Sequence, residues 1–411
     1  MPGSQIICVS PPATETTLAW LAMVLTPGLG PRRIFRAVRG MREPADIFQL
    51  PLTALEALQI PLVSARFIAE GKARKAAEQE WQRIAESGCS LMTFGDADYP
   101  ERLREIFDPP PVLWVRGDRA LLSRPAIAVV GTRAPSPYGT GMAEMLSRDL
   151  AARRMVILSG MARGVDTAAH KGALSAGGRT VAVWGTGLDV VYPKENKRLA
   201  EDLVMSGGSI VSEQPMGTFP APQNFPLRNR IISGMSVGVL VVEAGEQSGT
   251  RVTARCALEQ NRDVYAVPGN VTSRNAWGPN TLIKQGAKLV ATWEDVWEEL
   301  PSQIRLELEG RPASGDRVQD SLFASGDESE AGVTASLLRQ GESALPAGPP
   351  LSAPEAAVYG VLRMDEAVQI EELLERLEGQ VTSAEIFTAL FELELNNHIR
   401  QLPGKNYVRR M

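Results

Sequence analysis

Histidine, cysteine and the common cofactor motifs are scarce in this chain of 411 residues. The two histidines, His170 and His398, are too few for metal sites that need two or three imidazoles, such as HExxH. Three cysteines without CxxC spacing fit a reducing compartment better than a disulfide framework or a zinc knuckle. Neither the Walker pattern GxxxxGKS/T nor GxGxxG occurs, since Val190 stands where the third glycine after Gly185 and Gly187 would be. We therefore expect no metal and no cofactor, and a nicotinamide dehydrogenase is a weak interpretation.

Long apolar runs are absent as well. The early run at residues 18–25 is far shorter than the roughly 18 residues that a membrane-spanning helix needs, and the N-terminus lacks the pattern of a signal peptide. The composition, 44% apolar and 22% charged with a formal net charge of −5, is typical of two or three folded domains. We expect a cytoplasmic protein with no membrane span.

Residues 14–90 have apolar side chains at helical spacing and predict a helical domain of the SAM or helix-hairpin-helix kind. In the turn at residues 26–31, Gly28 and Gly30 permit a tight approach to the next helix, whose first backbone amides can bind a phosphate. The more common alternative is a plain helical turn followed by arginines on a solvated face. These arginines are Arg32, Arg33, Arg36 and Arg39.

Residues 95–300 alternate short β-branched runs with segments long enough for crossover helices. The predicted strands lie at residues 112–115, 126–130, 156–158, 180–183, 209–211, 237–242, 263–266 and 288–290. Uninterrupted apolar strands such as residues 239–242 are what a parallel sheet covered on both faces requires. The fold class is therefore α/β, with a Rossmann-like, doubly wound and mostly parallel sheet.

Residues 301–353 lose periodicity and predict a disordered linker rich in Gly, Ser, Pro and acidic residues. Residues 354–411 give three helical patterns and a hairpin around Pro403-Gly404, which predict a winged helix. Residues 355–399 contain 10 acidic residues and 2 arginines, so we expect this domain to contact protein and not to read duplex DNA.

Glycine-rich loops follow four of the predicted strands. They span residues 131–133, 159–166, 185–187 and 243–250. Loops after parallel strands gather at the sheet edge where ligands bind, and glycines let backbone amides approach a phosphate closely. Tight turns would explain one such loop, but four loops accompanied by Arg133 and Arg163 favour a phosphate-binding rim.

The segment at residues 224–234 is the sharpest local signal. It places Arg228 and Arg230 beside Asn229, and guanidinium groups bind phosphates or stack on bases. Phe225 and Trp184 offer aromatic faces for a single-strand groove, with packing in the core as the alternative for both. Residues 127–234 hold 12 Lys and Arg against 8 Asp and Glu, so a basic patch is available in an acidic protein.

The sequence offers few candidates for catalysis. His170 is more often a structural residue in such a position, and no nucleophile with a base and an orienting group is visible. Glu213 and Glu243, near strand ends, are the remaining candidate acids.

Six motifs in order resemble the DprA/Smf family, the DNA-processing protein A family. They are Gly131-Thr-Arg133, residues 159–166, Gly185-Thr-Gly-Leu-Asp-Val-Val-Tyr-Pro193, Asn224-Phe-Pro-Leu-Arg-Asn-Arg230, residues 248–255 and Ala266-Val-Pro-Gly269. The match covers about residues 95–300, and the flanking domains resemble that family more loosely. Leu227 and Arg251 depart from its pattern, since a basic residue and a small or apolar residue would be expected there.

The resemblance implies a single-stranded-DNA-binding recombination mediator without catalysis. It implies a protein that protects incoming DNA during natural transformation, loads the recombinase RecA, and forms a homodimer through the Rossmann-like domain. It also implies that Arg133, Arg163, Lys171, Arg228 and Arg230 bind the strand. Together with the loop residues, the expected DNA-binding set is Gly131, Arg133, Ser159, Gly160, Arg163, Lys171, Asn224, Phe225, Arg228, Asn229, Arg230, Ser248, Gly249 and Thr250.

The competing interpretation is a hydrolase of nucleoside phosphates with a related fold. Such enzymes place a glutamate in a GTxxE motif, whereas the corresponding segment here, Gly249-Thr-Arg-Val-Thr253, ends in threonine. This argues against hydrolysis, although Glu243 remains available as a substitute acid.

Overall fold

The computed structural model describes residues 13–246, 248–310, 352–362, 368–369, 373–374, 376–377, 381–395, 398–402 and 406–409. The chain divides into two compact units, residues 1–317 and 318–411. Among the described residues, no helix is both long and apolar enough to cross a bilayer.

Short helices form the N-terminal part of the first unit. They are α1 (Glu15–Leu25), α2 (Pro31–Val38), the 3-10 helix η1 (Pro44–Gln49), α3 (Leu52–Ala57), α4 (Leu62–Ala69) and α5 (Lys72–Ser87). Helix α1 begins where the Thr14 side chain accepts a hydrogen bond from the Thr17 amide at 3.1 Å, which satisfies one amide of the first turn. Trp20 and Leu21 of α1 are buried in the core of this helical module.

The turn before α2 has its carbonyl groups covered by side chains. Gly28 adopts φ +77°, a conformation that favours glycine, and its carbonyl oxygen accepts a hydrogen bond of 3.0 Å from Arg33 Nη1. Ser64 Oγ donates to the Pro27 carbonyl at 2.7 Å. The arginines of α2 are exposed, as the solvated-face interpretation expects, and phosphate binding at this turn stays a prediction.

Nine strands form one sheet in the order β1-β2-β6-β5-β4-β3-β7-β8-β9. Their bounds are β1 (Ser90–Thr93), β2 (Val112–Gly117), β3 (Ala126–Val130), β4 (Val156–Ser159), β5 (Thr180–Trp184), β6 (Ser209–Ser212), β7 (Gly238–Val241), β8 (Asp263–Ala266) and β9 (Lys288–Leu289). The strands from β6 to β9 are parallel, whereas β1 and β2 add an antiparallel edge. The predicted Rossmann-like, mostly parallel sheet is confirmed, and β1 is the strand that the sequence patterns missed.

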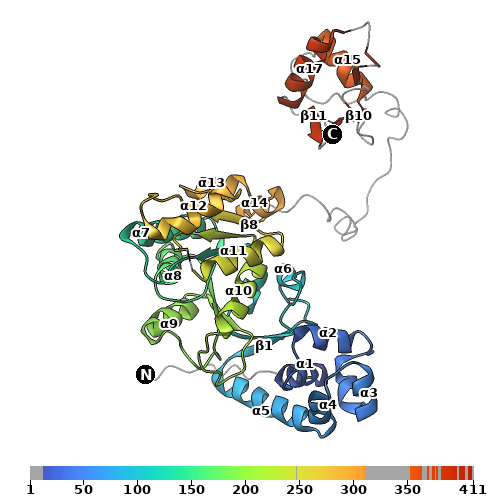
Figure 1. Ribbon diagram of the computed structural model, residues 1–411, viewed down its shortest axis with the longest axis vertical. Helices are drawn as coiled ribbons and strands as arrows, with labels where there is room; N and C mark the ends of the chain where they lie inside the picture. Colours follow the sequence, from blue (N-terminus) through green and yellow to red (C-terminus); the bar gives the residue numbers. More distant parts are fainter. Residues whose placement is uncertain are drawn as a thin grey trace, which may run out of the picture. The chain divides into compact units, whose positions relative to one another are not determined.

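Helices cover both faces of this sheet (Figure 1). They are α6 (Glu101–Arg104), α7 (Pro137–Ala152), α8 (Val165–Ser175), α9 (Lys197–Met205), α10 (Asn224–Met235), α11 (Thr250–Glu259), α12 (Trp277–Lys284), α13 (Trp293–Glu298) and α14 (Ser302–Glu309). Along β3, Ile127 and Val129 pack with α7 and α8, while Ala128 and Val130 pack with α10 and α11. Both faces of the central strand are therefore buried, as its uninterrupted apolar sequence requires.

The end of the first unit differs from the prediction that a linker begins at residue 301. Residues 302–309 form α14, and Ile304 and Leu308 are buried in the same core as Leu146 of α7. The spacing of Ile304 and Leu308 in the sequence is that of one face of a helix. Charged residues around them make this pattern hard to recognise. The rest of the predicted linker, residues 311–351, lies outside the described residues.

The second unit contains the predicted winged helix. Its described elements are α15 (Ala353–Val361), β10 (Val368–Gln369), α17 (Ser383–Leu395), β11 (Ile399–Leu402) and β12 (Asn406–Arg409). β12 pairs with both β10 and β11 in an antiparallel sheet, and the Pro403-Gly404 turn lies outside the described residues. Ser352 and Glu355 form a capping box at the start of α15.

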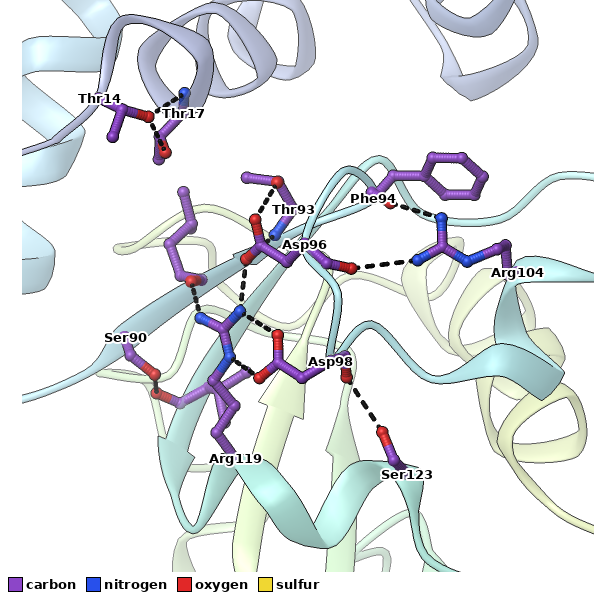
Figure 2. Close-up of polar contacts among 12 residues, drawn as sticks. Thr14, Thr17, Ser90, Thr93, Phe94, Asp96, Asp98, Arg104, Arg119 and Ser123 are labelled. Atoms are coloured by element: carbon purple, nitrogen blue, oxygen red, sulfur yellow. Dashed lines mark hydrogen bonds and ion pairs between the residues drawn. The ribbon is translucent and has the colours of Figure 1, made fainter. Parts of the chain in front are cut away.

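Two polar anchors fix the edge of the sheet and tie the helical module to it. Arg119 binds the carboxylates of Asp96 and Asp98, with Nε 2.5 Å from Asp98 Oδ2, and donates to the Leu91 carbonyl of β1 at 2.7 Å (Figure 2). Deeper in the module, the buried Glu80 carboxylate of α5 accepts hydrogen bonds from Trp114 Nε1 of β2 at 3.0 Å and from the Met216 amide at 2.7 Å. These contacts explain why the helical module and the sheet share one compact unit.

Candidate functional site

A pocket opens at the carboxyl ends of β3 and β7, where the winding of the sheet reverses direction. From β3 the chain winds outward through β4, β5 and β6, and then it returns to place β7 on the other side of β3. Such a switch point leaves a crevice because the helices after the two strands lie on opposite faces. The crevice here, the central pocket, has a volume of about 870 Å³. Eight of the predicted DNA-binding residues line it: Gly131, Arg133, Phe225, Arg228, Asn229, Ser248, Gly249 and Thr250.

The first wall of the central pocket is the loop after β3. The Thr132 amide donates to the Glu243 carbonyl at 2.7 Å, so this loop is held directly against the chain leaving β7. A Cβ on residue 131 would lie 2.5 Å from Val165 Cγ2 and 2.9 Å from the Glu243 carbonyl oxygen. Glycine is therefore required at Gly131 because the start of α8 approaches the backbone too closely for any side chain.

Arg133 and two aromatic rings form the rim of the central pocket. The Arg133 guanidinium lies 5.6 Å from the centre of the Phe225 ring, and the Tyr192 ring lies 5.6 Å from the same ring at an interplanar angle of 42°. Arg133 is exposed, and no carboxylate of the described part of the chain lies within ion-pair distance of it. The rim thus offers a cation without an ionic partner beside aromatic faces, an arrangement suited to a phosphate and a base.

The floor of the central pocket is made by Arg228 and Asp166. Arg228 Nη1 donates to the Gly160 carbonyl at 2.7 Å and also to the carbonyl of Val183, and the side chain is buried. Burial lowers the pKa of Arg228 to about 10, so the guanidinium stays charged at neutral pH. Burial also raises the pKa of Asp166, against the opposing effect of the nearby Arg228 charge. Both groups are buried, which leaves Arg133 as the positive group of the pocket that is open to solvent.

The opposite wall is the loop that leads into α11. The Ser248 hydroxyl accepts a hydrogen bond of 3.2 Å from the Thr250 amide and donates to Thr250 Oγ1 at 2.9 Å. A Cβ on residue 249 would meet no atom within 4 Å, so Gly249 is not required by packing. The start of α11 therefore faces the pocket with hydroxyl groups and a glycine around its first amides.

Six predicted residues do not line the pocket. Ser159 and Asn224 are buried and donate to the carbonyl oxygens of Val129 at 2.7 Å and of Gly185 at 3.1 Å, while Gly160 accepts from Arg228. Their roles in the structure are to hold the neighbouring loops in place. The remaining three are Arg163, Lys171 and Arg230.

The positions of these three basic residues have clear physical causes. Lys171 lies in the interior of α8, which runs away from the carboxyl edge of the sheet, and Arg163 makes a surface ion pair of 2.5 Å with Glu195. Arg230 follows Arg228 by two positions on α10, and because such positions lie about 200° apart around a helix the two cannot face the same pocket. Arg230 is instead buried against Glu213 and, with Nε at 3.3 Å, Asp108.

Thirteen of the residues that line the central pocket were absent from the predicted set, among them Thr132, Asp166, Tyr192 and Asn275. Asp166 and Tyr192 stand inside motifs that carried the family resemblance, and their place in these motifs was the available signal. Trp184 is 2% exposed and belongs to the core, so the core alternative holds for this residue, whereas Phe225 lines the pocket.

The candidate catalytic groups are engaged in structural contacts. Glu243 accepts from the Ser136 amide at 2.8 Å and the Ser136 hydroxyl at 2.6 Å, which fixes the start of α7. Glu213 binds Arg230, and burial raises its pKa. His170 is fully buried, bonds to Thr180 Oγ1 at 2.7 Å, and has its pKa lowered to about 3 by burial. None of the three lines the central pocket.

The two departures from the family pattern lie outside the central pocket. Leu227 is 48% exposed, and Arg251 donates to the Glu246 carbonyl at 3.0 Å with its guanidinium 5.2 Å from the Trp277 ring centre. Neither side chain belongs to the lining, so neither departure changes the walls of the pocket.

The chain matches two family models and is similar to several known proteins. The model of a family described as DNA recombination-mediator protein A matches residues 90–301, and that of the DprA winged helix domain matches residues 342–405. Protein Smf of Escherichia coli is 40% identical over 348 residues, covering 82% of this chain and 81% of that protein. The DNA processing protein DprA of Bacillus subtilis is 43% identical over 219 residues, covering 53% of this chain and 73% of that protein. The X-ray structure of DNA processing protein A from Streptococcus pneumoniae superposes with a TM-score of 0.59 at 34% identity, covering 71% of this chain and 99% of that one.

Proposed function

Since the chain belongs to the family of DNA recombination-mediator protein A, we propose that it binds single-stranded DNA in the central pocket and protects that DNA for recombination. The observation that carries the proposal is the rim formed by Arg133, Phe225 and Tyr192 over glycine-containing loops. An arginine without an ionic partner attracts a phosphate, and aromatic rings accept any base by stacking. The expected binding is therefore tight for single strands and tolerant of sequence.

In this proposal the phosphate and the base of a nucleotide bind at different places in the pocket. Phosphate binds at the rim, where Arg133 is exposed and a Cβ on residue 249 would meet no atom within 4 Å. A base enters against Phe225, above the floor formed by the buried side chains of Arg228 and Asp166. A duplex keeps its bases stacked inside and cannot place one there, so it binds more weakly.

The wider role in this proposal is that of a mediator in natural transformation, which transfers the protected strand to the recombinase RecA. A homodimer through the Rossmann-like domain would let two central pockets hold one strand and raise avidity through effective concentration. The acidic winged helix, with 10 acidic residues against 2 arginines in residues 355–399, is assigned a protein partner in this scheme.

A hydrolase acting on nucleoside phosphates is the less favoured function. Thr253 lines the central pocket at the position where a GTxxE motif would supply its acid, and Glu243 turns instead to Ser136 at the start of α7. Incubation with nucleoside monophosphates and chromatography for released base tests this alternative. Release of free base that depends on Asp166 or Glu243 would replace the mediator with an enzyme.

Fluorescence anisotropy of labelled single-stranded and duplex oligonucleotides, at two salt concentrations, tests the proposed function. Arg133→Ala should weaken single-strand binding about tenfold and reduce the salt slope by about 0.7, the value for one lost phosphate contact. Arg163→Ala is the matched control, because Arg163 is also an exposed arginine of a strand-end loop but does not line the central pocket. Equal binding of duplex and single strand, or equal losses in the two variants, would contradict the assignment of the site.

A further inference from the structure

A second cavity lies beside the central pocket, at the carboxyl ends of β7 and β8. Its volume is about 500 Å³, and its floor includes Val242 and Val267, which follow these two strands. The Tyr138 ring forms part of its wall, and Ser273 and Asn270 contribute polar groups. This β7/β8 cavity is therefore largely aliphatic at its floor, with one aromatic ring and a few polar groups.

The aromatic wall of the β7/β8 cavity is held in place. Tyr138 belongs to the first turn of α7, and its hydroxyl donates to the Pro268 carbonyl at 2.7 Å, which ties the ring to the loop after β8. The side chain is 49% exposed, so its ring is accessible to a ligand. A tethered and partly exposed ring over aliphatic side chains suits a flat heteroaromatic group.

The charge of the β7/β8 cavity selects against a phosphate. The lining contains the carboxylate of Glu243, and no Lys or Arg belongs to the described lining. The Glu243 carboxylate accepts three hydrogen bonds, two from Ser136 and one of 3.3 Å from Asn275 Nδ2. An anion would meet this carboxylate, whereas a neutral base, with N–H donors of its own, would not be repelled.

The β7/β8 cavity shares a thin wall with the central pocket. Asn275 lines the central pocket, while Ser273 and Ala276, on either side of it in the chain, line the β7/β8 cavity. Asn275 Nδ2 also donates to the Ala134 carbonyl at 3.1 Å, so this residue spans the gap between the loop after β3 and the loop after β8. Because neighbouring strands are about 4.8 Å apart, the two cavities are separated by only one or two strand spacings.

From these observations we propose that the β7/β8 cavity is a second nucleobase site, which takes the base adjacent to the one in the central pocket. The proposal rests on the proposed function, since it requires a single strand whose phosphates lie at the Arg133 rim. The two cavities would then hold successive bases on either side of Asn275, with the connecting phosphate outside both. Stacking on Tyr138 and burial against Val242 and Val267 supply the binding energy.

The test uses the full chain and oligonucleotides of abasic sugar-phosphate units that carry no base, one adenine or two adjacent adenines. This design does not depend on where along the strand the protein binds. One adenine should raise the affinity by filling the central pocket, and the second should raise it roughly tenfold more, as expected for one stacked base. Ser273→Trp, which fills the β7/β8 cavity, should abolish the gain from the second adenine and keep the gain from the first.

Val271→Trp is the matched control, because Val271 is 87% exposed on the same loop and does not line the cavity, so this variant should behave as the wild type. Tyr138→Ala removes the aromatic wall without filling the space and should reduce the same second gain, which keeps the test valid if Ser273→Trp fails to fold. A second adenine that adds nothing in the wild type, or a gain that survives both variants, overturns the second site while the proposed function stands. Failure of every oligonucleotide to bind overturns both.

Discussion

The Arg228 guanidinium donates a 2.7 Å hydrogen bond to the carbonyl oxygen of Gly160, and the two groups fit together only because residue 160 has no side chain. A Cβ at this position would lie 2.2 Å from Arg228 Nη1. The same guanidinium also binds the carbonyl of Val183, so it joins the ends of β4 and β5 beneath the central pocket. A buried arginine that satisfies backbone carbonyl groups fixes the ends of β4 and β5 beneath the central pocket.

Gly160→Ala should therefore lower the free energy of unfolding by about 2–4 kcal/mol, because Arg228 must leave its buried position to avoid the new methyl group. Urea unfolding followed by tryptophan fluorescence measures this loss. The matched control is Gly141→Ala in α7, where the added Cβ meets nothing within 4 Å and the change should stabilise by about 0.5–1 kcal/mol. A loss of similar size in both variants would show that the contact with Arg228 is not the cause.

The strand pattern and the loop motifs could be predicted from the sequence because both depend on local rules. Uninterrupted apolar runs marked the central parallel strands, such as β3 and β7, and glycines after the strands marked the edge where the central pocket lies. β1 escaped prediction because its four residues, Ser90–Thr93, begin soon after the end of α5 and include a single β-branched side chain. The helix α14 escaped because its two buried apolar residues stand among charged ones.

The direction of individual arginines could not be predicted in the same way. Arg228 and Arg230 look equivalent in the sequence, and only the helical backbone of α10 sends one to the floor of the central pocket and the other to Glu213. Arg163 looks available until Glu195, 32 positions away in the chain, is seen to pair with it. Contacts between residues far apart in the chain decided which charges remain free, and no pattern within a motif contains that information.

Arg230 should contribute strongly to the stability of the fold and be dispensable for DNA binding. Arg230→Met leaves Glu213 and Asp108 without their partner, and loss of one member of a buried ion pair costs about 3–5 kcal/mol. At a urea concentration low enough to keep the variant folded, its single-strand affinity and salt slope should match the wild type. Anisotropy and urea unfolding on the same samples measure both quantities, and a salt slope reduced by about 0.7 would instead mean that Arg230 contacts a phosphate.

His170 should make the stability fall as the pH is lowered. Burial holds its pKa at about 3 in the folded protein, whereas in the unfolded chain it titrates near 6.5, so below pH 6.5 the unfolded state binds a proton that the native state does not. This contribution is fully present above pH 6.5 and decreases by about 1.4 kcal/mol per pH unit toward pH 3. Urea unfolding of wild type and His170→Asn between pH 7.5 and pH 5 isolates it, because asparagine can keep the hydrogen bond to Thr180 without titrating. Parallel pH profiles for the two proteins would contradict the assignment.

Glu80 provides the most direct test of how the helical module is attached to the sheet. Its carboxylate accepts hydrogen bonds from the Trp114 indole N–H and the Met216 amide. Glu80→Leu leaves these two buried donors without an acceptor and should lower the free energy of unfolding by about 2–4 kcal/mol. Glu80→Gln keeps an acceptor oxygen and should lower it less. Burial raises the pKa of Glu80 above its unfolded value, so the native state favours the protonated acid and its stabilising contribution declines as the pH rises through the folded pKa. The cost of Glu80→Gln should therefore be smaller at pH 8 than at pH 4. Urea unfolding at the two pH values measures this difference. A cost that grows with pH would mean that the ionised carboxylate, through Arg83 at 3.6 Å, is the form that holds the module in place.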